Sequence, residues 1–380
     1  MENSIPTDLI IEIVSRLPAK SAARCRCVSK PWRSILRRQG FTDLFLTRSK
    51  AYPRLLLAVR QDGEWSFYST PQPQNPSEKS SLVVSAADFH IKFSKGTSGY
   101  NCSYASGLIY FHKMCIPRED EDLKRVICNP LTGQYVILPE LPPELRGGSY
   151  SYLGFDPVNK EFKVLFMSTC MYIADNDTDH YILTLGAEEL RWREIKCPFT
   201  HEPFWERICI DGVLYYSAQH GIYDVIVCFD VRSETFKFVG AESRFDQLIN
   251  YKGKLGGIKL ECERMFGPVE LHMRVLEDVE KQEWSKYDYT LSAEIDVFNV
   301  KEYLSVHGVT ATGDIVLLMK SAPARALFNA FYFNPERKTF QSVEIQGVGV
   351  DRDCKLQAFV DYVEDLSIND DAMQLKSSTF

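Results

Sequence analysis

A chain of 380 residues with 45% hydrophobic and 25% charged residues has the composition of a globular protein, long enough for a small module and one large domain. Its formal net charge of −7 is unevenly distributed, because residues 1–50 hold ten Lys and Arg against four Asp and Glu, a balance of +6 that leaves −13 for the remainder. The N-terminal residues carry no basic segment and the longest apolar runs have the length of strands. We therefore expect neither a signal peptide nor a transmembrane helix, and no association with membranes.

The eleven cysteines are an odd number, scattered without any Cys-x-x-Cys pair. In a chain without secretion signals this pattern predicts reduced thiols, and hence a protein of the nucleus, the cytoplasm or both. Tetrahedral zinc sites usually draw ligands from close cysteine pairs. We therefore expect no metal site and no cofactor.

The first 46 residues predict three short helices. Pro6 suits a first helical turn because the N–H group that it lacks would be unpaired there, and Asp8 adds negative charge at the positive end of the same helix. Pro18 ends this helix. Between them, apolar residues recur at helical spacing and form one broad face: Leu9, Ile10, Ile13, Val14 and Leu17.

A second helix is expected over about residues 19–27, and a third after Ser29, which is a plausible N-cap with Pro31 in the first turn. Trp32 lies on the apolar face of the third helix, which Gly40 is expected to end. A unit of about 45 residues without disulfides or metal rarely stands alone. Its apolar face therefore needs a cover from elsewhere.

The basic residues of this segment permit three interpretations. The first is a solvated helix face, and the second is a surface that attracts an acidic protein partner. The third, nucleic-acid binding, is disfavoured because the aromatic platforms that bind single strands are missing and Trp32 lies on the apolar stripe. We therefore expect no nucleic-acid partner.

The order of these residues resembles the F-box, the adaptor-binding motif of ubiquitin-ligase receptor subunits. The motifs that match are Ile5-Pro6, Leu17-Pro18, Arg24-Cys25, Val28-Ser29-Lys30 and Trp32. The departures are Ile5 in place of the usual Leu and the Ala22-Ala23 pair where one bulkier residue is common. The resemblance implies binding to a Skp-family adaptor and, through it, to a cullin scaffold. The implied adaptor-binding residues are Ile5, Pro6, Leu9, Ile10, Leu17, Pro18, Val28 and Trp32.

After Ser49 helical periodicity nearly disappears, and two turn motifs recur. The first motif is an apolar residue followed by Asn or Asp. Pro often comes next, and an aromatic residue stands six positions after the Asn or Asp. Its four copies begin at Cys128-Asn129, Phe155-Asp156, Phe229-Asp230 and Phe333-Asn334. The second is a glycine leading into a strand, where it supplies a positive φ. Its four copies contain Gly107, Gly212, Gly253 and Gly313.

Short strands separated by turns over some 310 residues predict a radial array, because a single sandwich of that size would be unusual and a propeller blade takes about 40–50 residues. We expect a large all-β, β-propeller-like domain of about six blades, with seven as the alternative. Leu55–Val59 and Leu356–Val363 are both strand-like, and pairing them would close the ring and remove its exposed edges.

This second part resembles the F-box-associated domain of plant F-box proteins, a divergent kelch-like region. Two of its motifs occupy the same places relative to the F-box in that family: Cys128-Asn129-Pro130-Leu131-Thr132-Gly133 and Phe155-Asp156-Pro157. The expected organisation is a helical F-box at 1–46, an F-box-associated domain at 51–365 that recognises the target, and a polar tail at 366–380.

No catalytic motif is present, and the seven histidines are isolated in the sequence. Two adjacent aromatics, Phe204 and Trp205, follow Pro203 and cannot both point the same way from a strand. Core packing of both is the default expectation, and the alternative is that one of them is exposed in a recognition loop, which makes Phe204 and Trp205 the candidate target-binding residues. The family resemblance implies a non-catalytic substrate receptor of an SCF-type ubiquitin ligase, whose target protein is not identified. A propeller that binds a small molecule or carbohydrate, or acts on one as an enzyme, remains the alternative.

Overall fold

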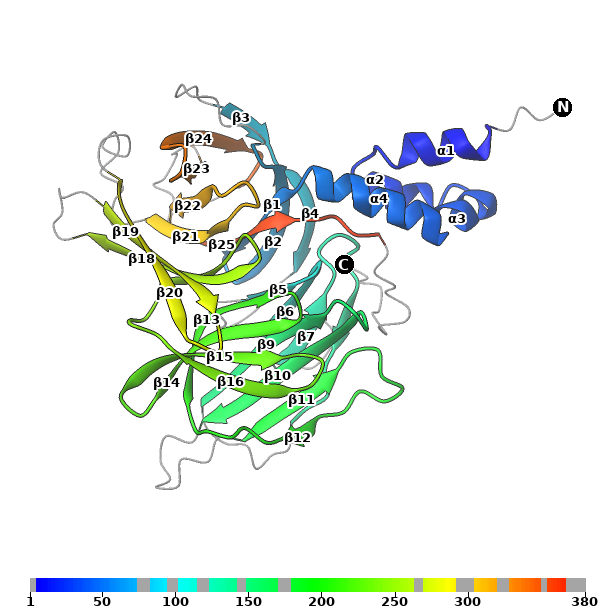
Figure 1. Ribbon diagram of the computed structural model, residues 1–380. Helices are drawn as coiled ribbons and strands as arrows, with labels where there is room; N and C mark the ends of the chain where they lie inside the picture. The colour runs from blue at the N-terminus through cyan, green and yellow to red at the C-terminus, as the bar shows by residue number, and fades with distance from the viewer. Residues whose placement is uncertain are drawn as a thin grey trace.

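The computed structural model describes residues 5–73, 83–93, 102–114, 123–141, 148–169, 179–262, 269–291, 304–319, 328–349 and 354–366. A unit of helices at the N-terminus is followed by a ring of β-sheets, and Figure 1 shows the helices standing beside the ring rather than within it. None of the helices in the described residues is long and apolar enough to cross a membrane.

The helical unit contains four helices where the sequence predicted three. They are α1 (Thr7–Val14), α2 (Ala19–Cys25), α3 (Lys30–Leu36) and α4 (Gln39–Ala51). The predicted N-cap of the third helix is confirmed, because the Ser29 hydroxyl oxygen accepts a hydrogen bond from the Trp32 N–H at 3.3 Å. Gly40, which was expected to end α3, instead lies in the first turn of α4.

A small apolar core joins the four helices to the ring. Phe41 and Phe45 lie one turn apart on α4 and both face this core, which explains why α4 forms although its other residues are mostly polar. The buried members, which we call the helix core, are Ile10, Val14, Ala19, Ala22, Ile35, Leu36, Phe41, Phe45, Leu131 and Leu366. The last two belong to the ring, so the ring covers part of the apolar surface that the sequence left uncovered.

The ring has six blades, each an antiparallel sheet of four strands, with one parallel strand added to the sixth blade. Blade 1 is β25 (Lys355–Tyr362), β1 (Arg54–Gln61), β2 (Glu64–Pro71) and β4 (Asp88–Phe93). Blade 2 is β5 (Cys102–Ala105), β6 (Leu108–Met114), β7 (Lys124–Cys128) and β8 (Tyr135–Ile137). Blade 3 is β9 (Gly148–Asp156), β10 (Glu161–Thr169), β11 (His180–Thr184) and β12 (Arg193–Ile195).

Blade 4 is β13 (Glu202–Ile210), β14 (Val213–His220), β15 (Tyr223–Asp230) and β16 (Thr235–Gly240). Blade 5 is β17 (Gln247–Tyr251), β18 (Lys254–Cys262), β19 (Val269–Asp278) and β20 (Glu283–Leu291). Blade 6 is β21 (Leu304–Val309), β22 (Ile315–Met319), β23 (Asn329–Asn334) and β24 (Thr339–Gln346), joined by β3 (Val83–Ala86), which pairs in parallel with β24. The predicted six-bladed propeller is therefore present.

The ring closes as the sequence predicted, by pairing strands from its two ends. β1 and β25 are antiparallel neighbours, with Leu56 opposite Phe359 and Val59 opposite Leu356. Because the last strand of the described residues completes the first blade, β1 is paired on both sides, with β25 and with β2, and β25 becomes the inner strand of that blade.

The two recurrent turns occupy nearly regular places in the blades. All four glycine turns join the first and second strands of a blade. At Asp211 and Gly212, for example, φ is 45° and 87°, the two positive values that a type I′ hairpin requires. Three of the four Asn/Asp turns join the third and fourth strands, whereas the turn at Asp156 joins the first and second strands of blade 3. The four copies are therefore not equivalent, since the same turn chemistry serves two places.

The helices lie on one face of the ring. The Glu364 carboxylate, two residues after β25, accepts a buried hydrogen bond from the Ala19 N–H at 3.0 Å, and Arg26 donates to the Leu366 carbonyl oxygen at 3.1 Å. Lys20 donates to the Phe89 and His90 carbonyl oxygens at the start of β4. In Figure 1 the arrow of β25 points toward the helices, so the C-terminal ends of the inner strands face them.

Candidate functional sites

The first candidate site is the outer surface of the helical unit. Ile5, Leu9 and Val28 expose 52%, 52% and 64% of their surface, and Pro6 and Pro18 are exposed as well. Ile13, one turn after Leu9, is 57% exposed and extends the same stripe. Its helical spacing from Leu9 could have identified it as a member of this surface. We call Ile5, Leu9, Ile13 and Val28 the exposed apolar stripe.

Three of the eight predicted adaptor-binding residues are placed differently. Ile10 is 5% exposed and belongs to the helix core, so it supports the stripe from beneath rather than presenting a contact surface. Leu17 and Trp32 are half-buried against the same core. The reason is the spacing of α1: its apolar face is broader than one stripe, and the side that includes Ile10 turns toward the other helices.

A charged network lies beside this surface. Glu12 forms ion pairs with Arg16, on the same helix, and with Arg48 of α4, the latter at 2.8 Å. Hydrogen bonds from Arg48 and Arg16 hold the pKa of the Glu12 carboxyl below its ordinary value. The network ties α1 to α4, while Arg24 and Arg33 remain exposed and keep the outer surface basic.

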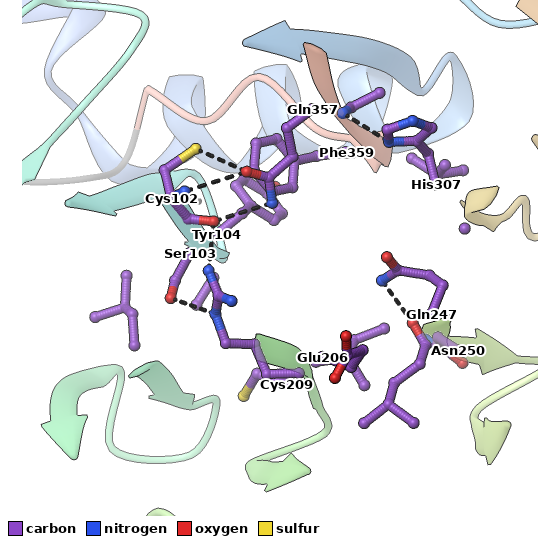
Figure 2. A pocket seen from close by; sticks show the side chains of 18 of the residues that line it. Cys102, Ser103, Tyr104, Glu206, Cys209, Gln247, Asn250, His307, Gln357 and Phe359 are labelled. Atoms are coloured by element: carbon purple, nitrogen blue, oxygen red, sulfur yellow. Dashed lines mark hydrogen bonds between the residues drawn. The ribbon is translucent and has the colours of Figure 1, made fainter. Parts of the chain in front are cut away.

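The second candidate site is the central channel of the ring. A cavity of about 840 Å³ is lined by residues of all six inner strands, β5, β9, β13, β17, β21 and β25. Arg207 of β13 reaches across it to blade 2, where its guanidinium donates to the Ser103 hydroxyl at 3.0 Å and to the Cys102 carbonyl oxygen at 2.7 Å (Figure 2). The same guanidinium lies over the Tyr152 ring, 5.3 Å from its centre.

Arg207 marks a cationic position in this channel that sequence reasoning missed. Its hydrogen bonds with described residues go to neutral oxygens, the third being the Trp205 carbonyl oxygen. Burial lowers the pKa of its guanidinium. An arginine in a strand of mixed composition carries no local signal of burial, so only the ring could place it here.

Trp205 lines the channel, and both Phe204 and Trp205 precede Arg207 on β13, an inner strand whose C-terminal end faces the helices. The strand pairing of β13 is irregular between Pro203 and Arg207, and this irregularity lets the two aromatics diverge. Trp205 is 41% exposed and packs on Tyr150 with ring centres 4.9 Å apart. Phe204 is half-buried beneath Arg244, whose guanidinium lies 4.0 Å from the ring centre.

The polar groups of the channel are arranged for structure rather than for nucleophilic chemistry. His307 Nδ1 accepts a hydrogen bond from the Ala358 N–H at 3.1 Å, which places its proton on Nε2 facing the Ser305 hydroxyl at 2.8 Å. That imidazole therefore cannot accept a proton from Ser305. Burial raises the pKa of the Cys102 thiol to about 12, so this thiol stays protonated. The alternative of an enzyme in the channel is not favoured.

The fold and the first site together define a class of protein: a helical module with an exposed apolar stripe, joined to a six-bladed propeller. Residues 3–44 match the F-box domain family, and residues 54–363 match the F-box associated beta propeller domain. The chain belongs to the family of F-box proteins that carry this propeller domain.

Relatives in Arabidopsis thaliana extend over the whole chain. F-box only protein 12 is 60% identical across 100% of this chain and 85% of its own length. Putative F-box protein At1g30930 is 63% identical across 99% of this chain and 98% of its own length. Among solved structures, TolB from Acinetobacter baumannii has a TM-score of 0.41 and 9% identity, covering 81% of this chain and 67% of TolB, a likeness that bears on no functional point.

Proposed function

We propose that this chain is the substrate-receptor subunit of an SCF-type ubiquitin ligase. Its helices would bind a Skp-family adaptor and, through it, a cullin scaffold, while the propeller holds a target protein. The observation that carries the proposal is the exposed apolar stripe of Ile5, Leu9, Ile13 and Val28 on an F-box, turned to solvent although the ring covers other apolar residues of the same helices.

In this role the chain performs no bond chemistry. It holds the target close to ubiquitin activated elsewhere in the complex, so that a dilute encounter becomes a local one. The two candidate sites suit such a bridge because they lie on different parts of the molecule. The stripe is on the helices, whereas Trp205 lines the channel from the N-terminal half of β13, an inner strand whose C-terminal end faces the helices.

The energetics of the stripe set the size of the expected effects. Full burial of a Val, Leu or Ile side chain contributes roughly 1.5–3 kcal/mol, and each stripe residue still has about half of its surface to bury, so each would contribute about 1 kcal/mol or more. A charge buried without a partner at the same position costs several times as much. Replacing Leu9 and Val28 by Asp should therefore weaken adaptor binding at least tenfold, since about 1.4 kcal/mol corresponds to a factor of ten.

The test uses the full-length chain co-expressed with a Skp-family adaptor. Leu9→Asp and Val28→Asp, singly and together, are expected to lose the adaptor from the purified complex. Their positions are exposed, so the helices should remain folded. Leu17 suits this test less well, because it packs on the helix core and its replacement by Asp would disturb the helices themselves.

Ile222→Asp is the matched control, because Ile222 is 83% exposed on the β14–β15 hairpin, far from the helices. It should retain the adaptor as the unaltered chain does. Circular dichroism and thermal melting of each variant establish that the fold is intact. Full retention of the adaptor by the folded Leu9→Asp/Val28→Asp chain would contradict the proposal.

A further inference from the structure

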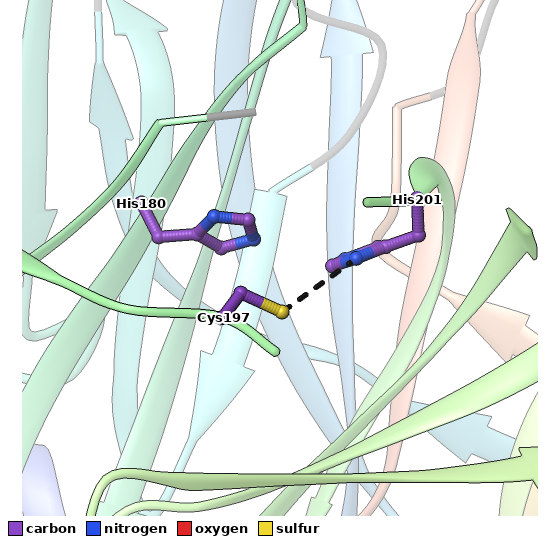
Figure 3. Close-up of side chains that lie close together, drawn as sticks. All are labelled: His180, Cys197 and His201. Atoms are coloured by element: carbon purple, nitrogen blue, oxygen red, sulfur yellow. Dashed lines mark hydrogen bonds between the residues drawn. The ribbon is translucent and has the colours of Figure 1, made fainter. Parts of the chain in front are cut away.

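Three side chains with metal-binding chemistry converge between blades 3 and 4. His180 begins β11, Cys197 lies in the linker that follows β12, and His201 immediately precedes β13. One ligand atom from each residue lies within 4.8 Å of the other two. Figure 3 shows the three side chains directed toward one another, with Cys197 between the two imidazole rings. Their separation along the chain hides this cluster from sequence reasoning.

The cluster is sheltered from water. His180 and His201 are 2% and 4% exposed, and Cys197 is half-buried. The two imidazole rings pack with centres 5.3 Å apart, and the rings of His180 and Phe236 make an edge-to-face contact with centres 5.4 Å apart. Aromatic rings around a cluster of ligands limit water access, as the apolar shell around a metal site does.

The hydrogen bonds leave one imidazole able to change tautomer. His201 Nδ1 donates to the Phe199 carbonyl oxygen at 3.1 Å, and Cys197 Sγ donates to the same oxygen at 3.2 Å. On the far side of the ring, Nε2 accepts from the Tyr216 hydroxyl at 2.8 Å. If Nδ1 bound a metal, its proton would move to Nε2 and be donated to the Tyr216 oxygen. A second hydrogen bond of that kind commonly fixes a ligating histidine.

We propose that His180, Cys197 and His201 form a binding site for a d10 transition-metal ion, Zn²⁺ or Cu⁺. One thiolate and two neutral imidazoles are a donor set that both ions accept. Cys197 Sγ and His201 Nδ1 are 3.9 Å apart, close to the roughly 3.5 Å that separates two ligands of a tetrahedral zinc ion with bonds of about 2.0–2.3 Å. A small inward movement of the linker completes the geometry.

In the metal-free chain the cluster holds a neutral imidazole and a protonated thiol. Burial lowers the pKa of His201 to about 4, so its imidazole keeps a lone pair for a metal at neutral pH. Burial raises the pKa of Cys197 to about 11, so without a metal the thiol stays protonated and is a poor nucleophile. Metal binding displaces that proton.

The place of the site in the fold gives it a structural role. Cys197 and His201 lie on the linker that connects blade 3 to blade 4, and the linker leads directly into Phe204 and Trp205. A metal held also by His180 would fasten this linker to β11. The site is independent of the proposed ligase function, because neither the helices nor the adaptor takes part in it.

The test measures metal binding by the full-length chain after chelation and dialysis. Zn²⁺ and Cu⁺ are added in separate arms, and Co²⁺ in a third as a spectroscopic probe whose charge-transfer band reports thiolate coordination. We expect about one equivalent per chain of at least one d10 ion to survive dialysis. Cys197→Ser and His180→Gln should lose that equivalent and the cobalt band, whereas Cys27→Ser, which alters an exposed thiol, should keep both.

A second measurement needs no variant and so remains informative if a substitution impairs folding. Zn²⁺ or Cu⁺ should protect Cys197 of the unaltered chain from alkylation at least tenfold, as read by mass spectrometry of the peptide that contains it, while exposed Cys27 is alkylated equally with and without metal. Equal alkylation of Cys197 in both conditions would overturn the proposal. Equal metal content in the unaltered chain and the folded Cys197→Ser variant would overturn it as well.

Discussion

Several histidines of the ring are buried in surroundings that lower their pKa values. His112 of β6 is 8% exposed and its two ring nitrogens face the hydroxyls of Ser149 and Ser151. Burial, followed by the positive charges of Arg125, Lys113 and Arg207, lowers its pKa to about 3. Burial also lowers the pKa of His90 to about 4. Both are held neutral where water would let them take up a proton.

These histidines predict loss of stability in mild acid. In the unfolded chain a histidine binds a proton below about pH 6.5, whereas folded His112 does so only near its lowered pKa of about 3. The unfolded state therefore binds more protons as the pH falls below about 6.5, and the free energy of unfolding decreases by up to about 1.4 kcal/mol per pH unit for each such histidine.

Denaturant unfolding between about pH 7 and pH 5 measures this slope above the range in which carboxylates titrate. His112→Gln should reduce the pH dependence, because Gln binds no proton in either state. Ile222→Gln, an exposed substitution that removes no titratable group, should leave the dependence as it is in the unaltered chain. A slope unchanged in His112→Gln would show that His112 is not held neutral by the fold.

At the scale of elements, local sequence signals predicted most of the ring. The glycine turns predicted hairpins because a type I′ turn requires positive φ, and Gly212 and Gly253 adopt it at 87° and 85°. The turn at Asp156 shows the limit of such signals. Its side chain accepts a hydrogen bond from the Val158 N–H, the same bond that Asp230 accepts from Arg232, although the two turns occupy different places in their blades.

The fourth helix was missed for a related reason. Gly40 comes two residues after the Arg37-Arg38 pair, a sequence typical of a helix end, and the apolar residues that follow it, Phe41, Leu44 and Phe45, make only a short stretch of helical spacing. A Cβ at Gly40 would meet nothing within 4 Å, so the position does not require glycine at all. What decides α4 is the burial of Phe41 and Phe45 against the other helices; their spacing is helical, but the sequence alone does not show what covers them.

The junction between helices and ring also escaped prediction. Leu131, in the turn between β7 and β8, is 5% exposed and belongs to the helix core. Asn129 shapes that turn by accepting a hydrogen bond from the Leu131 N–H at 2.9 Å. Leu366 was expected to begin a polar tail, yet it is 5% exposed in the same core, and the rest of that tail lies outside the described residues.

This junction predicts that Leu131→Ala loosens the helices from the ring. Truncating a buried leucine costs roughly 2–5 kcal/mol, and here the loss falls on the contact between the two parts. Limited proteolysis should cut the chain between α4 and β1 faster than in the unaltered protein. Leu138→Ala is the matched control, since Leu138 is 3% exposed within the ring alone. Equal protection of the α4–β1 connection in both variants would contradict this account of the junction.

For the whole molecule, the six-bladed ring and its closure followed from the spacing of turns, whereas the surfaces did not. From the sequence, core packing of both Phe204 and Trp205 was the default expectation and exposure of one was the alternative, and in the structure Trp205 is 41% exposed. It could not place Arg207 in the channel or show which ends of the inner strands face the helices. Those facts depend on how all six blades pack into the ring, and no single segment of the sequence determines that packing.

This arrangement predicts that the two proposed functions can be separated. A target held at the Trp205 end of the channel would contact a face of the ring that the helices do not reach, so its capture should not depend on the adaptor. Trp205→Ala removes an aromatic contact of the kind that dominates protein interfaces, which typically costs 2 kcal/mol or more, about a thirtyfold loss of affinity. Leu9→Asp should lose the adaptor and keep the target.

Affinity purification with the proteasome inhibited, compared across variants by quantitative mass spectrometry, measures this separation. Proteins recovered with the unaltered chain and with Leu9→Asp, but depleted with Trp205→Ala, are the expected targets. Tyr52→Ala is the control, because Tyr52 is 72% exposed beside the helices and away from that channel end. If Trp205→Ala retained every protein that the unaltered chain captures, the target would bind elsewhere on the ring, and the exposed indole would need another explanation.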